Sequence, residues 1–110
     1  MAFDFSRMEV LQSAQTTGNG TAHDLTFVSD EWAIYVEWSA GVSAGAVAIE
    51  TALTKDYSGT WAPLGGVTAT GASRVDVFAY SGATAAVRAR ISTTVTGGTV
   101  TCTLVTNPRR

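Results

Sequence analysis

Apolar and polar residues alternate with a period of two along most of the chain, whereas the spacing typical of an amphipathic helix is almost absent. Successive side chains of a β-strand point to opposite sides, so this alternation predicts strands that bury one side. The pattern is clearest in five segments, which are residues 32–39, 46–53, 74–79, 85–92 and 99–104. In the first segment the apolar side consists of Trp32, Ile34, Val36 and Trp38.

Three weaker segments are predicted to add strands, at residues 8–14, 25–28 and 61–69. The last of these contains Pro63 and a Gly65-Gly66 pair. Proline cannot donate a hydrogen bond to a sheet, so this segment is expected to be an edge strand, a bulged strand or two short pieces.

Glycine-rich turns separate the predicted strands every 8 to 15 residues. Short, evenly spaced strands with such turns predict an all-β fold, an antiparallel β-sandwich that is jelly-roll-like and has seven or eight strands. The segment 39–45 is expected to close a hairpin that places Trp38 opposite Val47, and the Gly97-Gly98 pair is expected to close another. Residues 1–110 are expected to form one domain, with residues 1–7 as a possible docking arm.

The chain of 110 residues is poor in charge, since only 15% of its residues are charged and its net charge is −2. Binding to a nucleic-acid backbone needs clustered Lys and Arg, which this chain lacks, and no stretch reaches the length of a membrane helix. The beginning of the chain shows no export signal, so synthesis in the cytoplasm is expected. The side opposite the apolar side is often small and neutral, which favours a component of a symmetric assembly. The residues that form this side are Ala33, Ala46, Ala48, Ala52, Ala86, Thr99, Thr101 and Thr103.

No catalytic, metal or cofactor site is predicted. Cys102 and His23 are single residues of their kind, and Cys102 is in phase with Val100 and Leu104, so a buried small side chain is expected there. Two carboxylate pairs could in principle serve as an acid and a base, but solvated side chains are the plainer interpretation. These pairs are Asp30 with Glu31 and Glu37 with Glu50. A calcium site at Asp24, Asp30 or Asp56 has no supporting ligand spacing.

The aromatic residues fall into two groups. Trp32 and Trp38 share a side with Ile34 and are therefore expected in the core. Tyr57 and Trp61 flank a glycine in a looser region and are the candidates for an exposed surface on which a glycan ring stacks.

Three segments resemble small β-sandwich structural proteins of tailed bacteriophages and prophages, in particular head decoration or cement-like proteins. The segments are residues 32–50 (WAIYVEWSAGVSAGAVAIE), 57–64 (YSGTWAPL) and 87–101 (VRARISTTVTGGTVT). The family pattern is a W-x-x-L segment after a short loop and a V-R-A-R-I strand that leads through Gly-Gly into the last strand. The resemblance covers about residues 30–106.

The resemblance implies a virion structural protein without enzymatic activity or cofactors, bound to the major capsid protein or to other virion proteins. It further implies a homo-oligomer, with a trimer favoured, that stabilises the head shell. Within that interpretation we expect Phe3, Phe5 and Arg7 to dock on a neighbour. The alternative is a carbohydrate-binding module of a neck or tail fibre that uses Tyr57 and Trp61.

Overall fold

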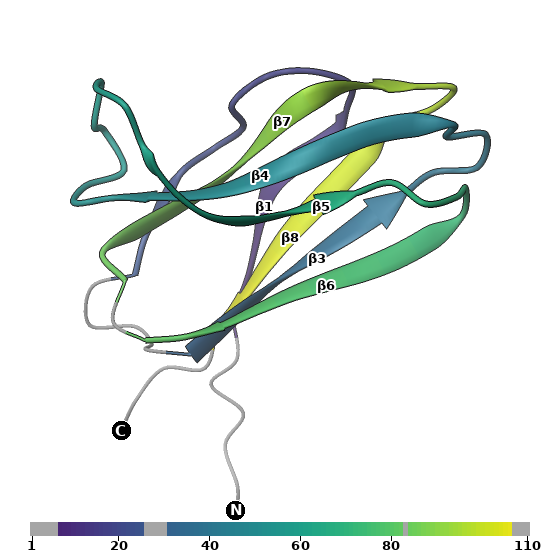
Figure 1. Cartoon of the computed structure of the whole chain (residues 1–110). Coiled ribbons are helices and arrows are strands. Elements are labelled where there is room, and N and C mark those ends of the chain that lie inside the picture. Colours follow the sequence, from purple (N-terminus) through teal and green to yellow (C-terminus); the bar gives the residue numbers. More distant parts are fainter. Residues whose placement is uncertain (1–6, 26–30, 83, 107–110) are drawn as a thin grey trace, which may run out of the picture.

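The computed structural model describes residues 7–25, 31–82 and 84–106, which form eight antiparallel strands in two stacked sheets (Figure 1). Sheet A contains, in spatial order, β1 (Arg7–Gln15), β8 (Val100–Thr106), β3 (Glu31–Trp38) and β6 (Arg74–Ser81). Sheet B contains β2 (His23–Asp24), β7 (Ala86–Thr96), β4 (Ala44–Ala52) and β5 (Ala62–Thr68). The predicted all-β sandwich is confirmed.

The strand order is that of a jelly roll. The ladders β1·β8, β2·β7, β3·β6 and β4·β5 are all antiparallel, as though one long two-stranded ribbon had been wrapped around a core. The further ladders β3·β8 and β4·β7 join neighbouring turns of that ribbon into the two sheets. This arrangement confirms the expected jelly-roll-like topology.

The core lies between the sheets and is formed by alternate residues of the long strands. The apolar side of β3 is buried, and it packs in one cluster with residues of the opposite sheet such as Val47 and Ile49. The indole N–H of Trp38 donates to Asp76 Oδ2 at 2.9 Å, so the one polar atom of this large side chain is satisfied at the edge of the core. The expected core positions of Trp32 and Trp38 are confirmed.

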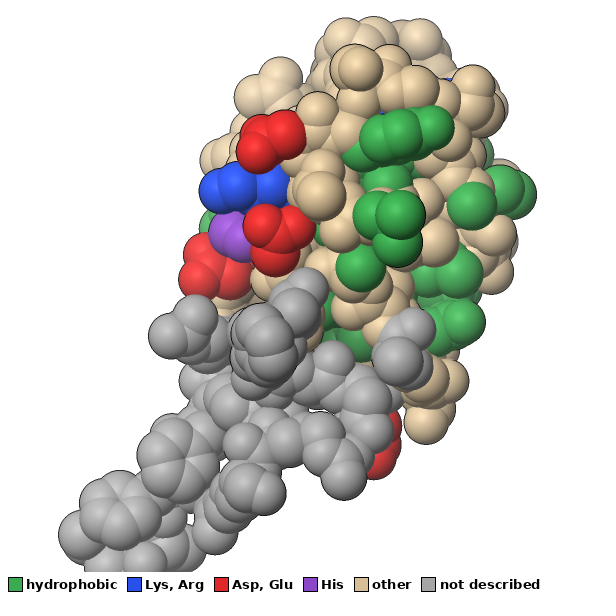
Figure 2. Space-filling view, turned by 90° about the vertical axis from the view of Figure 1, so that its left-hand side faces the viewer, with side chains coloured by type: hydrophobic (Ala, Val, Ile, Leu, Met, Phe, Trp, Pro, Cys, Tyr) green, Lys and Arg blue, Asp and Glu red, His purple; other side chains and the backbone are tan. Residues whose placement is uncertain are grey.

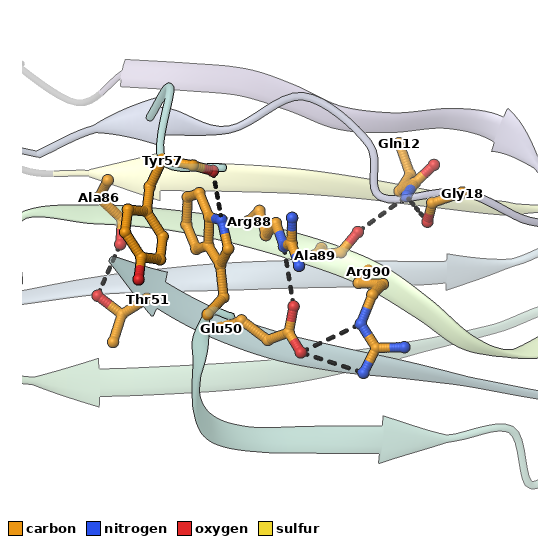
Figure 3. A network of polar contacts seen from close by, with 10 residues as sticks. Gln12, Gly18, Glu50, Thr51, Tyr57, Ala86, Arg88, Ala89 and Arg90 are labelled. Atoms are coloured by element: carbon orange, nitrogen blue, oxygen red, sulfur yellow. Dashed lines mark hydrogen bonds and ion pairs between the residues drawn. The ribbon is translucent and has the colours of Figure 1, made fainter. Parts of the chain in front are cut away.

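Gln12 ties the first strand to the opposite sheet. Its side chain is buried, and its Nε2 atom donates to the carbonyl oxygens of Gly18 at 3.0 Å and of Ala89 at 2.8 Å (Figure 3). Since Ala89 belongs to β7, the amide connects the two layers. A buried amide with both of these partners is stabilising, because an unpaired one would carry a desolvation cost.

The two expected hairpins are wrong. β3 lies in sheet A and β4 in sheet B, so Trp38 is paired with Arg74 and Val100 rather than with Val47. The Gly97-Gly98 segment likewise crosses from β7 in sheet B to β8 in sheet A. The physical reason is that strands with apolar sides can either pair edge to edge or face one another across a core, and alternation alone is compatible with both arrangements.

The weaker strands were predicted with mixed success. The expected edge strand at 61–69 is confirmed as β5, which forms the edge of sheet B and shows a register shift against β4 between Ile49 and Glu50. The prediction of a strand at 25–28 is wrong for Leu25, because β2 ends at Asp24. Leu25 is a buried residue that follows the strand. Residues 26–28 lie outside the described part of the chain.

Candidate docking surface

The outward faces of the two sheets differ in chemistry, and the outward face of sheet B is the charged one. Glu50 of β4 accepts hydrogen bonds from Arg88 Nε at 2.8 Å and from Arg90 Nε at 3.1 Å (Figure 3). Burial alone would raise the pKa of the Glu50 carboxyl, but the hydrogen bonds and charges of Arg90 and Arg88 outweigh it and hold the pKa below its usual value. This carboxylate is therefore a structural anion between two guanidinium groups.

Trp61 adds a second layer to this face. The Arg88 guanidinium lies over the Trp61 ring at 4.6 Å from its centroid, and the indole N–H donates to the Tyr57 carbonyl oxygen at 3.0 Å. Trp61 is only 4% exposed, whereas Tyr57 is 47% exposed. The segment between β4 and β5 thus folds back so that its last residue shields the charged network.

These contacts correct two candidate sites. The expected exposed stacking surface at Trp61 is not formed, because Arg88 covers the ring face. Glu37 and Glu50, considered as neighbours on one face, belong to different sheets: Glu37 is an exposed residue of β3, and Glu50 is buried in β4.

The outward face of sheet A carries exposed apolar side chains that continue from strand to strand. The register aligns two rows of residues across the four strands. The first row runs through Val77, Tyr35, Thr103 and Val10, and the second runs through Ala79, Ala33, Val105 and Met8. We call these two rows, together with Val75, the apolar stripe. Five of its large members are exposed, with Met8 at 74%, Val75 at 54%, Val77 at 51%, Val10 at 50% and Tyr35 at 43%, whereas Val105 is half-buried.

The size of the apolar stripe sets what it can do. Four strands about 4.8 Å apart, each contributing about three residues of about 3.3 Å, give together with Val75 a footprint of roughly 200 Å². This is smaller than the largest apolar patch of a typical monomer, which covers roughly 300–600 Å². Removing that area from water is worth roughly 5 kcal/mol before the cost of association. Since that cost is of similar size, the stripe supports attachment when further contacts act with it.

A shallow hollow adjoins the apolar stripe at the start of β3 and the end of β6. It encloses about 410 Å³ and is lined by Glu31, Trp32, Ala33, Tyr35, Ala79, Tyr80, Ser81 and Val105. Beneath it, the rings of Trp32 and Tyr80 stack with their centroids 5.2 Å apart. The hollow makes this end of the face concave.

Figure 2 shows one side of the molecule, on which hydrophobic side chains gather apart from a group of acidic, basic and histidine side chains. His23 Nε2 lies 3.8 Å from Glu9 Oε2, and this contact links β2 to β1. Asp24 Oδ1 accepts the Lys55 backbone N–H at 2.9 Å. These carboxylates thus serve contacts within the chain. Among the described residues, no group of three or more His, Cys, Asp or Glu side chains is placed to hold a metal ion.

The remaining residues singled out from the sequence occupy three kinds of position. Cys102 is buried, as expected, and burial raises the pKa of its thiol to about 12, so the thiolate that a nucleophile requires is suppressed. Arg7 opens β1 opposite Thr106. Phe3, Phe5 and Asp30 lie outside the described residues.

Sequence reasoning missed the apolar stripe. Val75 and Val77 alternate as core residues do, yet Phe78 and Tyr80 are the residues of β6 that pack against the core. Met8 and Val10 likewise point away from it. The available signal was that both sides of β6 carry large apolar residues, since Phe78 and Tyr80 alternate with Val77 and Ala79, which is unusual for an antiparallel strand that faces water on one side. The charged residues Arg74 and Asp76 on the core-facing side favoured the opposite, incorrect assignment.

The strand order and the packed core define an all-β jelly-roll sandwich. Among solved structures, the crystal structure of the SPBc2 prophage-derived protein YomS is similar to this chain, with a TM-score of 0.70, 11% sequence identity and coverage of 97% of each chain. At that identity the likeness establishes a shared fold. No family model matches the chain, and no curated protein matches its sequence at a significant level. Within the described ranges, no helix is long and apolar enough to cross a membrane.

Proposed function

We propose that the chain is a structural protein of a tailed-phage particle, and more specifically a head decoration protein that binds the outside of the shell and stabilises it. The observation that carries this proposal is the apolar stripe, an exposed and nearly uncharged sheet face that suits lasting contact with another protein. The opposite face, with its ion network and the covering Trp61, is left to solvent.

Two likenesses support a phage particle as the setting. The sandwich is shared over nearly the whole chain with a prophage-derived protein. The W-x-x-L and V-R-A-R-I segments resemble small structural proteins of phage heads, necks and tails. Both likenesses agree with a role in assembly, and we propose no catalytic activity for the chain.

The proposed partner is the major capsid protein or another virion protein. Residues 1–7, proposed as a docking arm with Phe3, Phe5 and Arg7, lead directly into β1, which carries Met8 and Val10 of the apolar stripe. Because the proposed arm and the apolar stripe both begin at β1, they can bind the same neighbouring protein. The arm would supply the additional contacts that the stripe requires.

A carbohydrate-binding module of a neck or tail fibre is less well supported. Of its two candidate rings, Trp61 is buried under Arg88 and only Tyr57 is half exposed. A single ring offers little of the stacking surface that a sugar platform needs.

The proposal is tested by quantitative mass spectrometry of purified particles from cells that carry the gene. We expect the chain to be present in hundreds of copies per particle, in proportion to the major capsid protein. A few dozen copies or fewer would move the chain to the neck or tail, and its absence from particles would refute a virion role.

A further inference from the structure

The four strands at the edges of the sheets differ in how well each could accept another strand. β2 has two residues, β5 contains Pro63 and a register shift, and β1 has two register shifts against β8. β6 pairs with β3 over eight consecutive residues without a shift. It contains no proline, lysine or bulge. Its two charged residues, Arg74 and Asp76, lie 3.6 Å apart as an ion pair, and Asp76 also accepts the Trp38 indole N–H.

The direction in which the β6 backbone groups point follows from the hydrogen bonds on the other side of β3, where β3 meets β8. Ser39 N, just beyond the end of β3, donates to Thr99 O of the β8 side at 3.0 Å. The carbonyl of Trp38 belongs to the same trans peptide and therefore points the opposite way, toward β6. Backbone groups of successive strand residues point to alternate sides, so even-numbered residues of β3 bond to β6 and odd-numbered residues bond to β8. The partners of those even-numbered residues on β6 are Arg74, Asp76, Phe78 and Tyr80.

The odd-numbered residues of β6 therefore direct their N–H and C=O groups away from β3, toward the free edge. They are Val75, Val77 and Ala79. In the described part of the chain β3 is the one strand paired with β6, and Figure 1 shows β6 at the outer margin of its sheet. Exposed backbone groups in a regular row form a template for an added strand.

We propose that β6 pairs with β6 of a second copy of this chain, antiparallel about a two-fold axis, so that the two A sheets become one continuous eight-stranded sheet. The proposal goes beyond the attachment to a particle and concerns the protein on its own. A strand that pairs with itself about a two-fold axis needs an edge that is complementary to its own reverse, and the sequence of β6 meets this condition.

Two registers of the paired β6 strands are possible that each align seven residue pairs. The two-fold axis passes through Val77 in the first register and through Phe78 in the second. The first places Arg74 opposite Tyr80 of the other copy and Asp76 opposite Phe78, and the second places Asp76 opposite Tyr80. Like charges face each other in neither register. Both registers also extend the apolar stripe across the axis, because Val75, Val77 and Ala79 share the outward face.

The second copy is favoured as the occupant because the contact is symmetric in charge and pattern. The interface is narrow, with about six to eight backbone hydrogen bonds, so a dissociation constant in the micromolar range is expected. A trimer, which the resemblance to decoration proteins implies, would need a different, heterologous contact.

The test uses the full chain in solution and one matched pair of variants. Sedimentation from about 5 to 500 µM should show a monomer–dimer equilibrium, which Val77→Lys weakens at least about tenfold by placing like charges close to the axis. Val10→Lys is the control, because Val10 lies on the same face, is 50% exposed against 51% for Val77, and sits on the far edge of the sheet. It should leave the equilibrium unchanged.

Amide hydrogen exchange of the unaltered chain provides the second readout and does not depend on any variant folding. At high concentration the amides of Val75, Val77 and Ala79 should gain protection, whereas those of Asp76 and Phe78 should be protected at every concentration. A chain that stays monomeric, forms a trimer, responds equally to both lysine variants or shows no gain at the odd-numbered amides would overturn the proposal. Loss of particle binding alone would leave it intact.

Discussion

Glu50 shows how single residues stabilise the outward face of sheet B. Its side chain is 8% exposed and lies between Arg88, at 17%, and Arg90, at 37%. Removing the carboxylate would leave two guanidinium groups close together without an intervening negative charge. Leaving a charge unpaired near the interior lowers the folding stability by more than the intact ion pair adds to it. The partial exposure of Arg90 to solvent reduces this loss.

We therefore expect Glu50→Gln to lower the free energy of unfolding by about 1–3 kcal/mol at neutral pH. The folded pKa of Glu50 lies below its unfolded value near 4.5, so its contribution is complete above that pH and is lost as the pH falls through the folded pKa. Urea unfolding at several pH values measures this. The difference between the two proteins should shrink below about pH 4.5.

Glu37→Gln is the control, because it makes the same change at an exposed residue of sheet A. It should change stability by less than about 0.5 kcal/mol. An equal effect of the two substitutions, or a Glu50 effect that does not depend on pH, would contradict the role assigned to the ion network.

At the scale of elements, two crossings between the sheets hold the end of the sandwich together. The β3–β4 and β7–β8 connections lie side by side, with Ser43 N bonded to Thr96 O at 2.9 Å and Thr99 N bonded to Ser39 Oγ at 2.9 Å. Gly97 has a φ of +84°, and a Cβ atom there would overlap the Gly41 carbonyl oxygen. Glycine is therefore required by both the backbone conformation and the close approach.

Gly97→Ala should accordingly destabilise the fold by roughly 2 kcal/mol or more, because a left-handed conformation and a backbone clash add together. Gly71→Ala is the matched control, since its added methyl group would meet only the Arg74 side chain, at 4.0 Å. Thermal unfolding of both variants makes the comparison. Equal melting temperatures for the two would show that the crossings can relax.

The sequence predicted the strands better than their pairing. Alternation located β3, β4, β7 and β8, because each buries one side of a long regular strand. It failed at the partners of β3 and β4, since a hairpin and a crossing between sheets bury the same apolar sides. At the candidate site, the side of β6 that faces the core could not be predicted, because both sides carry large apolar residues and the core-facing side also contains Arg74 and Asp76. The choice depends on Gly65 of the opposite sheet, which leaves room for the Phe78 ring.

At the scale of the whole molecule, the sandwich has two unlike faces. Sheet B presents charge and a folded-back segment, whereas sheet A presents the apolar stripe, with the hollow at one end and the free edge of β6 along one side. The two features of sheet A serve different contacts in our account. We propose that the face attaches the protein to its particle and that the edge joins two copies.

Binding of purified variants to particles that lack the protein tests the central claim most directly. Tyr35→Glu places a charge in the middle of the apolar stripe and away from both edges, while Ser92→Glu places the same charge at an exposed residue of sheet B. We predict that Tyr35→Glu folds normally but loses at least about tenfold in affinity, which corresponds to 1.4 kcal/mol, while Ser92→Glu binds as the unaltered chain does. Full binding by Tyr35→Glu, or an equal loss for both variants, would contradict the assignment of the sheet A face as the docking surface.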